Sequence, residues 1–183
     1  MTMLTPANQL TLLRMFLIPA FVILVVYGYL GSALAVFVTA GLTDALDGVI
    51  ARRSGQKTTL GAWLDPMADK LLLVTTFIVL TLPGLGLANR LPIWLTVLII
   101  SRDVGIVLTV AIVNLAVGPR TFKPSPLGKA ATAIFILACV VVMLFNYLGY
   151  PSRFVDAAIW ISLVITLASG VDYVWRIAKI VNK

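Results

Sequence analysis

Apolar residues follow one another along this chain in six long stretches, and the residues that interrupt helices gather between them. Each stretch has about the 20 mainly apolar residues that a helix needs to cross a bilayer. Short segments rich in glycine, proline or charge separate the stretches. The pattern therefore predicts six membrane-spanning helices, at residues 10–30, 33–51, 60–82, 92–117, 127–148 and 155–177.

The composition places these helices in a membrane. Hydrophobic residues make up 61% of the 183 residues and charged residues 11%, and the mean hydropathy is +1.06. Soluble domains have roughly 45–50% apolar and about 25% charged residues. We expect an all-α integral membrane protein that forms a single domain over residues 1–183. We do not expect a cleaved signal peptide, because no basic region precedes the first apolar stretch and Arg14 lies inside it.

The basic residues lie mainly at one end of the predicted helices. Those that follow the second, fourth and sixth stretches are Arg52, Arg53, Lys57, Arg120, Lys123, Lys129, Arg176, Lys179 and Lys183. The loops at the other end offer only Arg90 and Arg153. By the positive-inside rule both termini face the cytoplasm, and we expect a bacterial inner (cytoplasmic) membrane. The net charge of +7 favours membrane lipids with anionic headgroups as partners, and we expect no nucleic acid.

Four carboxylates are concentrated in one short part of the chain. All seven acidic residues are aspartates, and four of them fall within 26 residues: Asp44, Asp47, Asp65 and Asp69. The first two are three apart and the last two four apart, so each pair shares one face of a helix. The break at 54–59 lets the two helices run antiparallel, with their acidic faces together. Such a cluster favours two Mg²⁺ or Mn²⁺ ions, with Ca²⁺ as a competitor. Zinc lacks ligands, because the chain has no His and a single Cys.

The residues between the aspartates suit a phosphate-bearing ligand. Gly48, Ala51 and Gly61 carry little or no side chain, so a base or a phosphate can approach the backbone closely. Arg52 can add a charge-assisted hydrogen bond to phosphate. Two divalent ions on the aspartates would neutralise a pyrophosphate and polarise its phosphoryl oxygens.

The spacing from Asp44 to Asp69 reads D-x2-D-G-x2-A-R-x8-G-x3-D-x3-D. It matches in full the signature of the CDP-alcohol phosphotransferase family, and the chain resembles that family. Eight positions with a fixed residue at fixed spacing make a chance match rare. Residues 8–14 resemble the beginning of the family's first helix. The resemblance implies six transmembrane helices with an active-site cleft facing the cytoplasm, a homodimer, and transfer of a phosphatidyl group from CDP-diacylglycerol to an alcohol with release of CMP.

The resemblance also implies a role for each motif residue. Asp44, Asp47 and Asp65 ligate the metal ions with Asp69 contributing, and Asp69 also takes the proton from the acceptor hydroxyl. A metal ion lowers the pKa of a carboxyl group, so Asp69 needs some release from the metal to act as the base. The residues expected to bind the CDP-linked donor are Asp44, Asp47, Gly48, Ala51, Arg52 and Gly61.

Other interpretations of these residues stay open. Paired aspartates within membrane helices also serve ion pathways and proton relays. Gly48, Ala51 and Gly61 also suit close packing between helices. A small six-helix transporter or cation channel would need polar residues along a full path across the membrane, whereas here the charges cluster in one half of the helices.

Four further cations bear on the acceptor: Arg102, Arg120, Lys123 and Lys129. They favour an acceptor that carries phosphate, either glycerol 3-phosphate or phosphatidylglycerol, and we prefer glycerol 3-phosphate. The short chain and its first helix resemble phosphatidylglycerophosphate synthases, which usually have Arg-Glu where this chain has Arg102-Asp103. Segments 101–104 and 123–129 are closer to eukaryotic-type cardiolipin synthases. The alternative is that Arg102 and Asp103 form a structural pair and the other cations only set topology.

Overall fold

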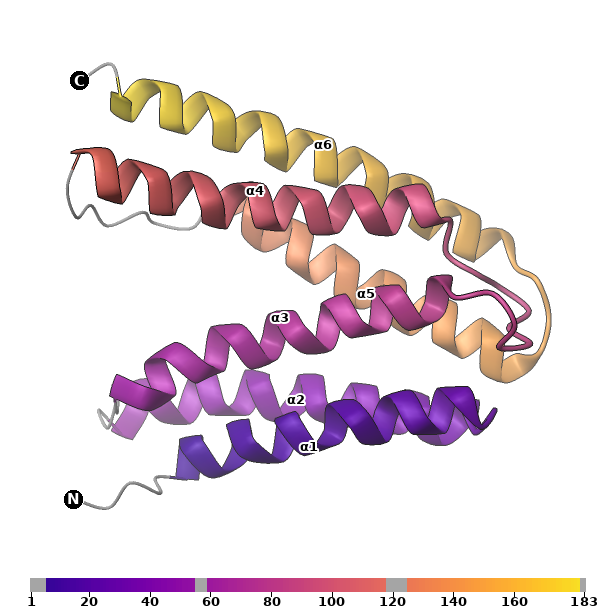
Figure 1. The fold of residues 1–183 in the computed structure, drawn as a ribbon. Coiled ribbons are helices and arrows are strands. Elements are labelled where there is room, and N and C mark those ends of the chain that lie inside the picture. The colour runs from indigo at the N-terminus through magenta and orange to yellow at the C-terminus, as the bar shows by residue number, and fades with distance from the viewer. Residues whose placement is uncertain (1–5, 55–58, 118–124, 182–183) are drawn as a thin grey trace. The chain divides into compact units, whose positions relative to one another are not determined.

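The structure, a computed structural model, describes residues 6–54, 59–117 and 125–181. Within these ranges only the backbone is described at residues 6–11, 44–54, 59–69, 114, 116–117 and 180–181. The described part of the chain forms six α-helices (Figure 1): α1 Pro6–Val26, α2 Leu30–Ser54, α3 Thr59–Thr81, α4 Ile93–Val117, α5 Pro126–Leu148 and α6 Arg153–Val181.

The helices confirm the all-α prediction, and their ends fall within four residues of the predicted stretches. Three of them contain segments long and apolar enough to cross a membrane: Ile93–Val113 in α4, Pro126–Leu148 in α5 and Arg153–Lys179 in α6. The described apolar segments of the other three are shorter: Leu12–Val26, Leu30–Thr43 and Lys70–Thr81. That all six helices span the bilayer therefore stays a prediction.

The chain divides into two compact units. The first unit consists of Met1–Arg90 and Met143–Pro151, and the second of Leu91–Val142 and Ser152–Lys183. Helix α5 thus begins in the second unit and ends in the first. The single domain expected over residues 1–183 stays a prediction.

In the first unit, α1 packs against both α2 and α3. Phe21 of α1 and Phe37 of α2 are buried with their ring centroids 6.0 Å apart, and Phe77 of α3 is also buried. Gly28, with φ of 79°, provides the left-handed conformation that turns the chain from α1 into α2. These contacts hold the three helices side by side, so the end of α2 and the beginning of α3 lie at the same end of the unit (Figure 1).

The other end of the first unit is fastened by two buried asparagines. The backbone N–H of Asn89 donates to Oδ1 of Asn146 at 2.7 Å, and Nδ2 of Asn146 donates to the carbonyl of Asn89 at 2.8 Å. Nδ2 of Asn89 donates in turn to the carbonyl of Tyr150 at 2.9 Å. These bonds satisfy polar groups that would be costly if left unpaired away from water. They join the connection after α3 to the end of α5.

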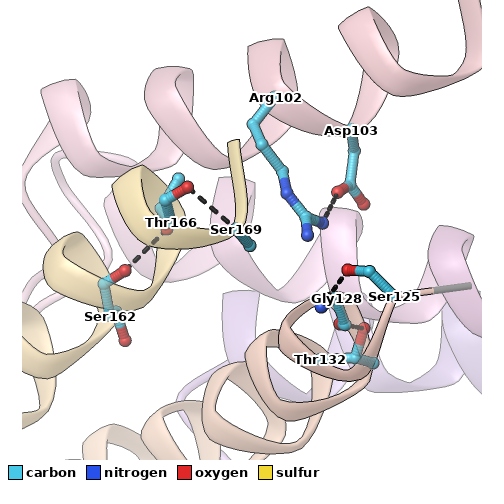
Figure 2. A network of polar contacts seen from close by, with 8 residues as sticks. All are labelled: Arg102, Asp103, Ser125, Gly128, Thr132, Ser162, Thr166 and Ser169. Carbon is cyan, nitrogen blue, oxygen red and sulfur yellow. Dashed lines mark hydrogen bonds and ion pairs between the residues drawn. The ribbon is translucent and has the colours of Figure 1, made fainter. Parts of the chain in front are cut away.

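In the second unit, α4 packs against α6 and runs in the same direction (Figure 1). The buried apolar side chains include Leu95 and Ile99 of α4 and Phe135 of α5. Two buried hydroxyls of α6 bond to their own helix. Thr166 Oγ1 donates to the Ser162 carbonyl at 2.6 Å, and Ser169 Oγ donates to the Thr166 carbonyl at 3.1 Å (Figure 2). Such bonds let a helix carry hydroxyl groups into apolar surroundings.

Candidate active site

The first part of the aspartate motif, residues 44–52, lies on the second half of helix α2. Helix α2 runs to Ser54 without interruption, although Gly48 lies within it. Positions 44, 47, 48 and 51 follow the i, i+3, i+4, i+7 spacing of one helix face. The backbone therefore supports the predicted grouping of Asp44, Asp47, Gly48 and Ala51, with Arg52 in the following position. The side chains of all five lie outside the described residues.

The rest of the motif lies on the first part of α3. Gly61, Asp65 and Asp69 are four apart in turn, so they too lie along one face of a continuous helix. Helices α2 and α3 run in opposite directions and are joined by residues 55–58 (Figure 1). The structure thus brings the two motif segments to one end of the first unit, as predicted. The side chains at 59–69 lie outside the described residues.

The donor set of the motif fits a hard divalent cation. Four carboxylates provide oxygen ligands, which Mg²⁺ and Mn²⁺ prefer. Among the side chains that the structure describes, no group of three or more His, Cys, Asp or Glu could hold a metal ion. The four aspartate side chains are not among them, so metal ligation by the aspartates stays a prediction.

Arg14 is a buried cation in the same unit. It lies on α1, which packs against α2 and α3, and only 1% of its surface is exposed. A buried guanidinium is stable only when oxygen atoms compensate its charge. The sequence analysis used Arg14 only as an argument against a signal peptide. Its position could have indicated a further role, because a single arginine inside an apolar membrane stretch is by default a candidate functional residue.

The cations expected to bind the acceptor lie in the second unit. Nη1 of Arg102 donates to Oδ1 of Asp103 at 2.6 Å, and their side chains are 11% and 18% exposed (Figure 2). The two residues therefore form the ion pair that the alternative interpretation expected, and phosphate binding by Arg102 stays a prediction. Nε of Arg102 is buried and has no hydrogen-bond partner among the described residues. Buried polar groups are normally satisfied, so this donor is an exception among the described side chains.

Arg102 reaches the first turn of α5. A Cβ atom at Gly128 would lie 3.6 Å from Nη2 of Arg102 and 3.2 Å from Oγ of Ser125. Ser125 caps this helix, because its Oγ accepts a hydrogen bond from the Gly128 N–H at 2.9 Å, and Pro126 occupies the first helical position. The sequence analysis missed the role of Ser125, although a serine before a proline is a typical helix start.

The four cations are placed only in part. Lys129 follows Gly128 in the first turn of α5 and is exposed, so the structure brings Lys129 into the same region as Arg102. Arg120 and Lys123 lie outside the described residues. Phosphate binding by the four cations stays a prediction.

A second ion pair lies on α6. Nε of Arg176 donates to both carboxylate oxygens of Asp172, at 3.0 and 2.9 Å. The sequence analysis counted Arg176 only as a topology charge. Its i, i+4 spacing from Asp172 could have indicated this pair.

Comparisons with known proteins bear on the whole chain. Residues 4–168 match the family model described as CDP-alcohol phosphatidyltransferase. The chain is 36% identical over 180 residues to a Mycobacterium tuberculosis protein named "Probable phosphatidylglycerophosphate synthase", covering 93% of this chain and 80% of that protein. It is 31% identical over 197 residues to a CDP-diacylglycerol–glycerol-3-phosphate 3-phosphatidyltransferase of Bacillus subtilis, covering 96% and 97%.

A further relative differs in its named product. The chain is 36% identical over 162 residues to a CMP-forming cardiolipin synthase of Homo sapiens, covering 78% of this chain and 52% of that protein. The chain thus spans about half the length of the human protein. The family model and these relatives confirm the resemblance that the aspartate motif on α2 and α3 indicated. The chain belongs to the CDP-alcohol phosphatidyltransferase family.

Proposed function

We propose that the protein transfers the phosphatidyl group of CDP-diacylglycerol to glycerol 3-phosphate and releases CMP, as a phosphatidylglycerophosphate synthase. Family membership makes it a membrane-embedded phosphatidyltransferase and decides against a transporter or channel. The observation that carries the choice of acceptor is the match, over nearly the full length of both chains, to the Bacillus subtilis enzyme whose name specifies glycerol 3-phosphate.

The reaction exchanges one phosphate ester for another. The hydroxyl oxygen of the acceptor forms a bond to the phosphorus of the phosphatidyl group, and Asp69 takes the hydroxyl proton. The bond from that phosphorus to the oxygen of CMP breaks, and CMP leaves with the electron pair. Asp44, Asp47 and Asp65, with Asp69 contributing, would hold two Mg²⁺ or Mn²⁺ ions, which neutralise the pyrophosphate when bound.

The other motif residues hold the donor in place. Gly48 and Ala51 on α2 and Gly61 on α3 leave room for the nucleotide and its phosphates, because they carry little or no side chain. Arg52 contacts a phosphate oxygen by a charge-assisted hydrogen bond. On the acceptor side, the guanidinium of Arg102, with the cations Arg120, Lys123 and Lys129, would bind the acceptor phosphate.

Cardiolipin synthesis is the second candidate. It is favoured by the likeness to the human cardiolipin synthase and by the Ser101-Arg102-Asp103 sequence. Its acceptor, phosphatidylglycerol, is a lipid, whereas glycerol 3-phosphate is soluble in water. The two candidates therefore differ in one measurable property, the acceptor that the enzyme consumes.

The deciding experiment measures CMP release by the purified protein in detergent, with CDP-diacylglycerol and Mg²⁺. Radiolabelled glycerol 3-phosphate is offered in one reaction and phosphatidylglycerol in a parallel one. We expect glycerol 3-phosphate to support CMP release and to appear in a labelled lipid product. Conversion of phosphatidylglycerol with no use of glycerol 3-phosphate would establish the second candidate.

Orientation and assembly are part of the proposal. We place both termini and the end of unit one that carries the aspartates in the cytoplasm of a bacterial inner membrane, and we expect a homodimer. A Thr58→Cys variant should react with a membrane-impermeant thiol reagent only from the cytoplasmic side. Cys139, the single native cysteine, is fully buried and adds no background. Light scattering of the detergent-solubilised protein checks for the dimer.

A further inference from the structure

A long apolar groove lies between α4 and α6 in the second unit. Its volume is about 820 Å³, within the range of roughly 300–1,000 Å³ that ligand pockets have. Along α4 it extends from Leu98 to Thr109, and along α6 from Thr166 to Ala178. At 1.5 Å per helical residue these segments are about 16–18 Å long. One leaflet of a bilayer has about that depth of hydrocarbon, half of roughly 30 Å.

Two glycines keep this groove open. Gly105 of α4 and Gly170 of α6 both line it, and a Cβ atom added at either would have no protein atom within 4 Å. Glycine in membrane helices usually lets two backbones approach each other. That explanation fails here, because neither glycine contacts a neighbouring helix through the face where its side chain would be. Both residues instead enlarge the space that the groove encloses.

A hydrogen bond between groove-lining residues joins the helices on either side of the groove. The hydroxyl of Tyr173 on α6 donates a hydrogen bond to the carbonyl of Ile106 on α4 at 3.0 Å, and both residues line the groove. This bond joins the two helices beside Gly105 and Gly170. The groove is therefore a built feature of the second unit.

The surroundings determine what can fill the groove. Both α4 and α6 contain segments long and apolar enough to cross a membrane. Along such segments the medium is lipid hydrocarbon, and water is not available to fill a depression. The exposed side chains along the α6 side, Leu167, Val171 and Val174, are apolar. An acyl chain matches these walls in polarity and in length.

One end of the groove carries a positive charge. Trp175 lines the groove, and Nζ of Lys179, one turn further along α6, lies 3.7 Å from the centroid of its indole ring. The cation–π contact holds the ammonium group at this end. Tryptophan and lysine are the residues that typically mark the level of lipid headgroups. Arg176, also in this turn, is already paired with Asp172.

We propose that the α4–α6 groove binds one acyl chain of an anionic glycerophospholipid of the surrounding membrane, with the lipid phosphate at Lys179. The groove lies in the second unit and contains no residue of the aspartate motif. The lipid is bound as a resident of this site and is not the donor undergoing reaction. Arg102, which is proposed to bind the acceptor phosphate, also lines the groove, so this inference rests on glycerol 3-phosphate being the acceptor.

The test measures lipid retention. Delipidated protein in detergent is mixed with vesicles of equal parts phosphatidylglycerol and phosphatidylcholine, repurified, and analysed for bound lipid by native mass spectrometry. We expect about one phosphatidylglycerol per chain. Gly170→Leu and Gly105→Leu add a side chain where a Cβ meets no protein atom within 4 Å, and they should lose most of it. Val107→Leu on the exposed part of α4 outside the groove is the matched control and should retain it.

The headgroup contact is tested separately. Lys179→Ala should reduce phosphatidylglycerol binding about tenfold, the effect of losing one charge-assisted hydrogen bond, whereas Lys179→Arg should restore it. The thermal midpoint and CMP release are measured on every variant to confirm folding. Equal lipid retention in Gly170→Leu, Val107→Leu and the wild type would overturn the proposal.

Three further results would also overturn it. A KM for CDP-diacylglycerol that rises in Gly170→Leu in proportion to the lost lipid would assign the groove to the donor. Loss of the dimer in Gly170→Leu with unchanged lipid retention would assign it to a second copy of the chain. Conversion of the retained phosphatidylglycerol when CDP-diacylglycerol is added would assign the groove to the acceptor. If glycerol 3-phosphate alone supports CMP release and Gly170→Leu still loses the lipid, the lipid is a resident of the groove.

Discussion

The aspartate segments of the first unit and the cationic cluster of the second are constructed in different ways. The aspartates lie on consecutive helices, α2 and α3, which are joined by residues 55–58, so their spacing along the chain nearly determines their spacing in the molecule. Arg102 and Lys129 lie on α4 and α5, and their proximity depends on how these helices pack. The arrangement of the aspartates is therefore encoded locally, whereas the proximity of Arg102 and Lys129 depends on tertiary contacts.

The two regions also differ in how their charges are balanced. Arg102 is held by the carboxylate beside it, Asp103, at 2.6 Å. The motif instead concentrates four carboxylates with Arg52 as its own cation, and a carboxylate cluster of that kind requires metal ions to be stable. Variants in the first region should therefore abolish the reaction, and variants in the second should change only its substrate dependence.

The largest expected effect comes from the metal ligands. Asp44→Asn, Asp47→Asn and Asp65→Asn should each lower CMP release by at least about a thousandfold, roughly 4 kcal/mol in the barrier, because the donor pyrophosphate loses its metal ions. Excess EDTA should have the same effect on the wild type, with recovery on adding Mg²⁺ or Mn²⁺. Asp156→Asn, an exposed aspartate in the first turn of α6, is the control. Full activity in EDTA would exclude a metal mechanism.

The next effect separates the base from the ligands. Asp69→Asn should lower kcat by about a hundredfold to ten-thousandfold, the usual contribution of a general base, with a smaller loss of donor affinity. Asp44→Asn should weaken both. Turnover and CDP-diacylglycerol binding are measured on the same preparations. If the two variants lose donor affinity equally, Asp69 is simply another metal ligand.

A smaller effect is expected in the cationic region. Arg120→Ala and Lys123→Ala should each raise the KM for glycerol 3-phosphate about tenfold to a hundredfold, because a charge-assisted hydrogen bond to phosphate contributes about 1.5–3 kcal/mol. The KM for CDP-diacylglycerol should stay within a few-fold. Arg153→Ala, at the other end of the helices, is the matched control. An unchanged acceptor KM in both variants would leave these cations with a topology role only.

The smallest effect concerns the helix that carries Lys129. Ser125→Ala removes the cap of α5 and should lower the free energy of unfolding by about 1 kcal/mol, measured as a lower thermal midpoint in detergent. Ser125→Thr, which keeps the hydroxyl oxygen on the same carbon, should restore most of the loss. A Ser125→Ala protein as stable as the wild type would show that this cap contributes nothing to the region around Arg102.

The sequence predicted the helices well because the signals are local. A helix that crosses a membrane satisfies its own backbone hydrogen bonds, so the length of an apolar stretch and the glycines and prolines beside it determine where the helix lies. The end of α3 at Thr81 and the start of α4 at Ile93 were predicted to within one residue for this reason. The faces that carry the aspartates followed from the helical period alone.

The burial of Arg14, the Asn89–Asn146 bonds and the groove depend on contacts between segments distant in the chain, so no local sequence pattern predicts them. The sequence by itself determined the helix order, the family and the aspartate motif, because a fixed spacing on consecutive helices leaves little freedom. The packing of α1 on α2 and α3 decided that Arg14 is buried, and the reciprocal bonds between Asn89 and Asn146 join residues 57 positions apart. The groove between α4 and α6 likewise arises only when Gly105 and Gly170 come to line one space, because burial and shape are properties of the packed helices.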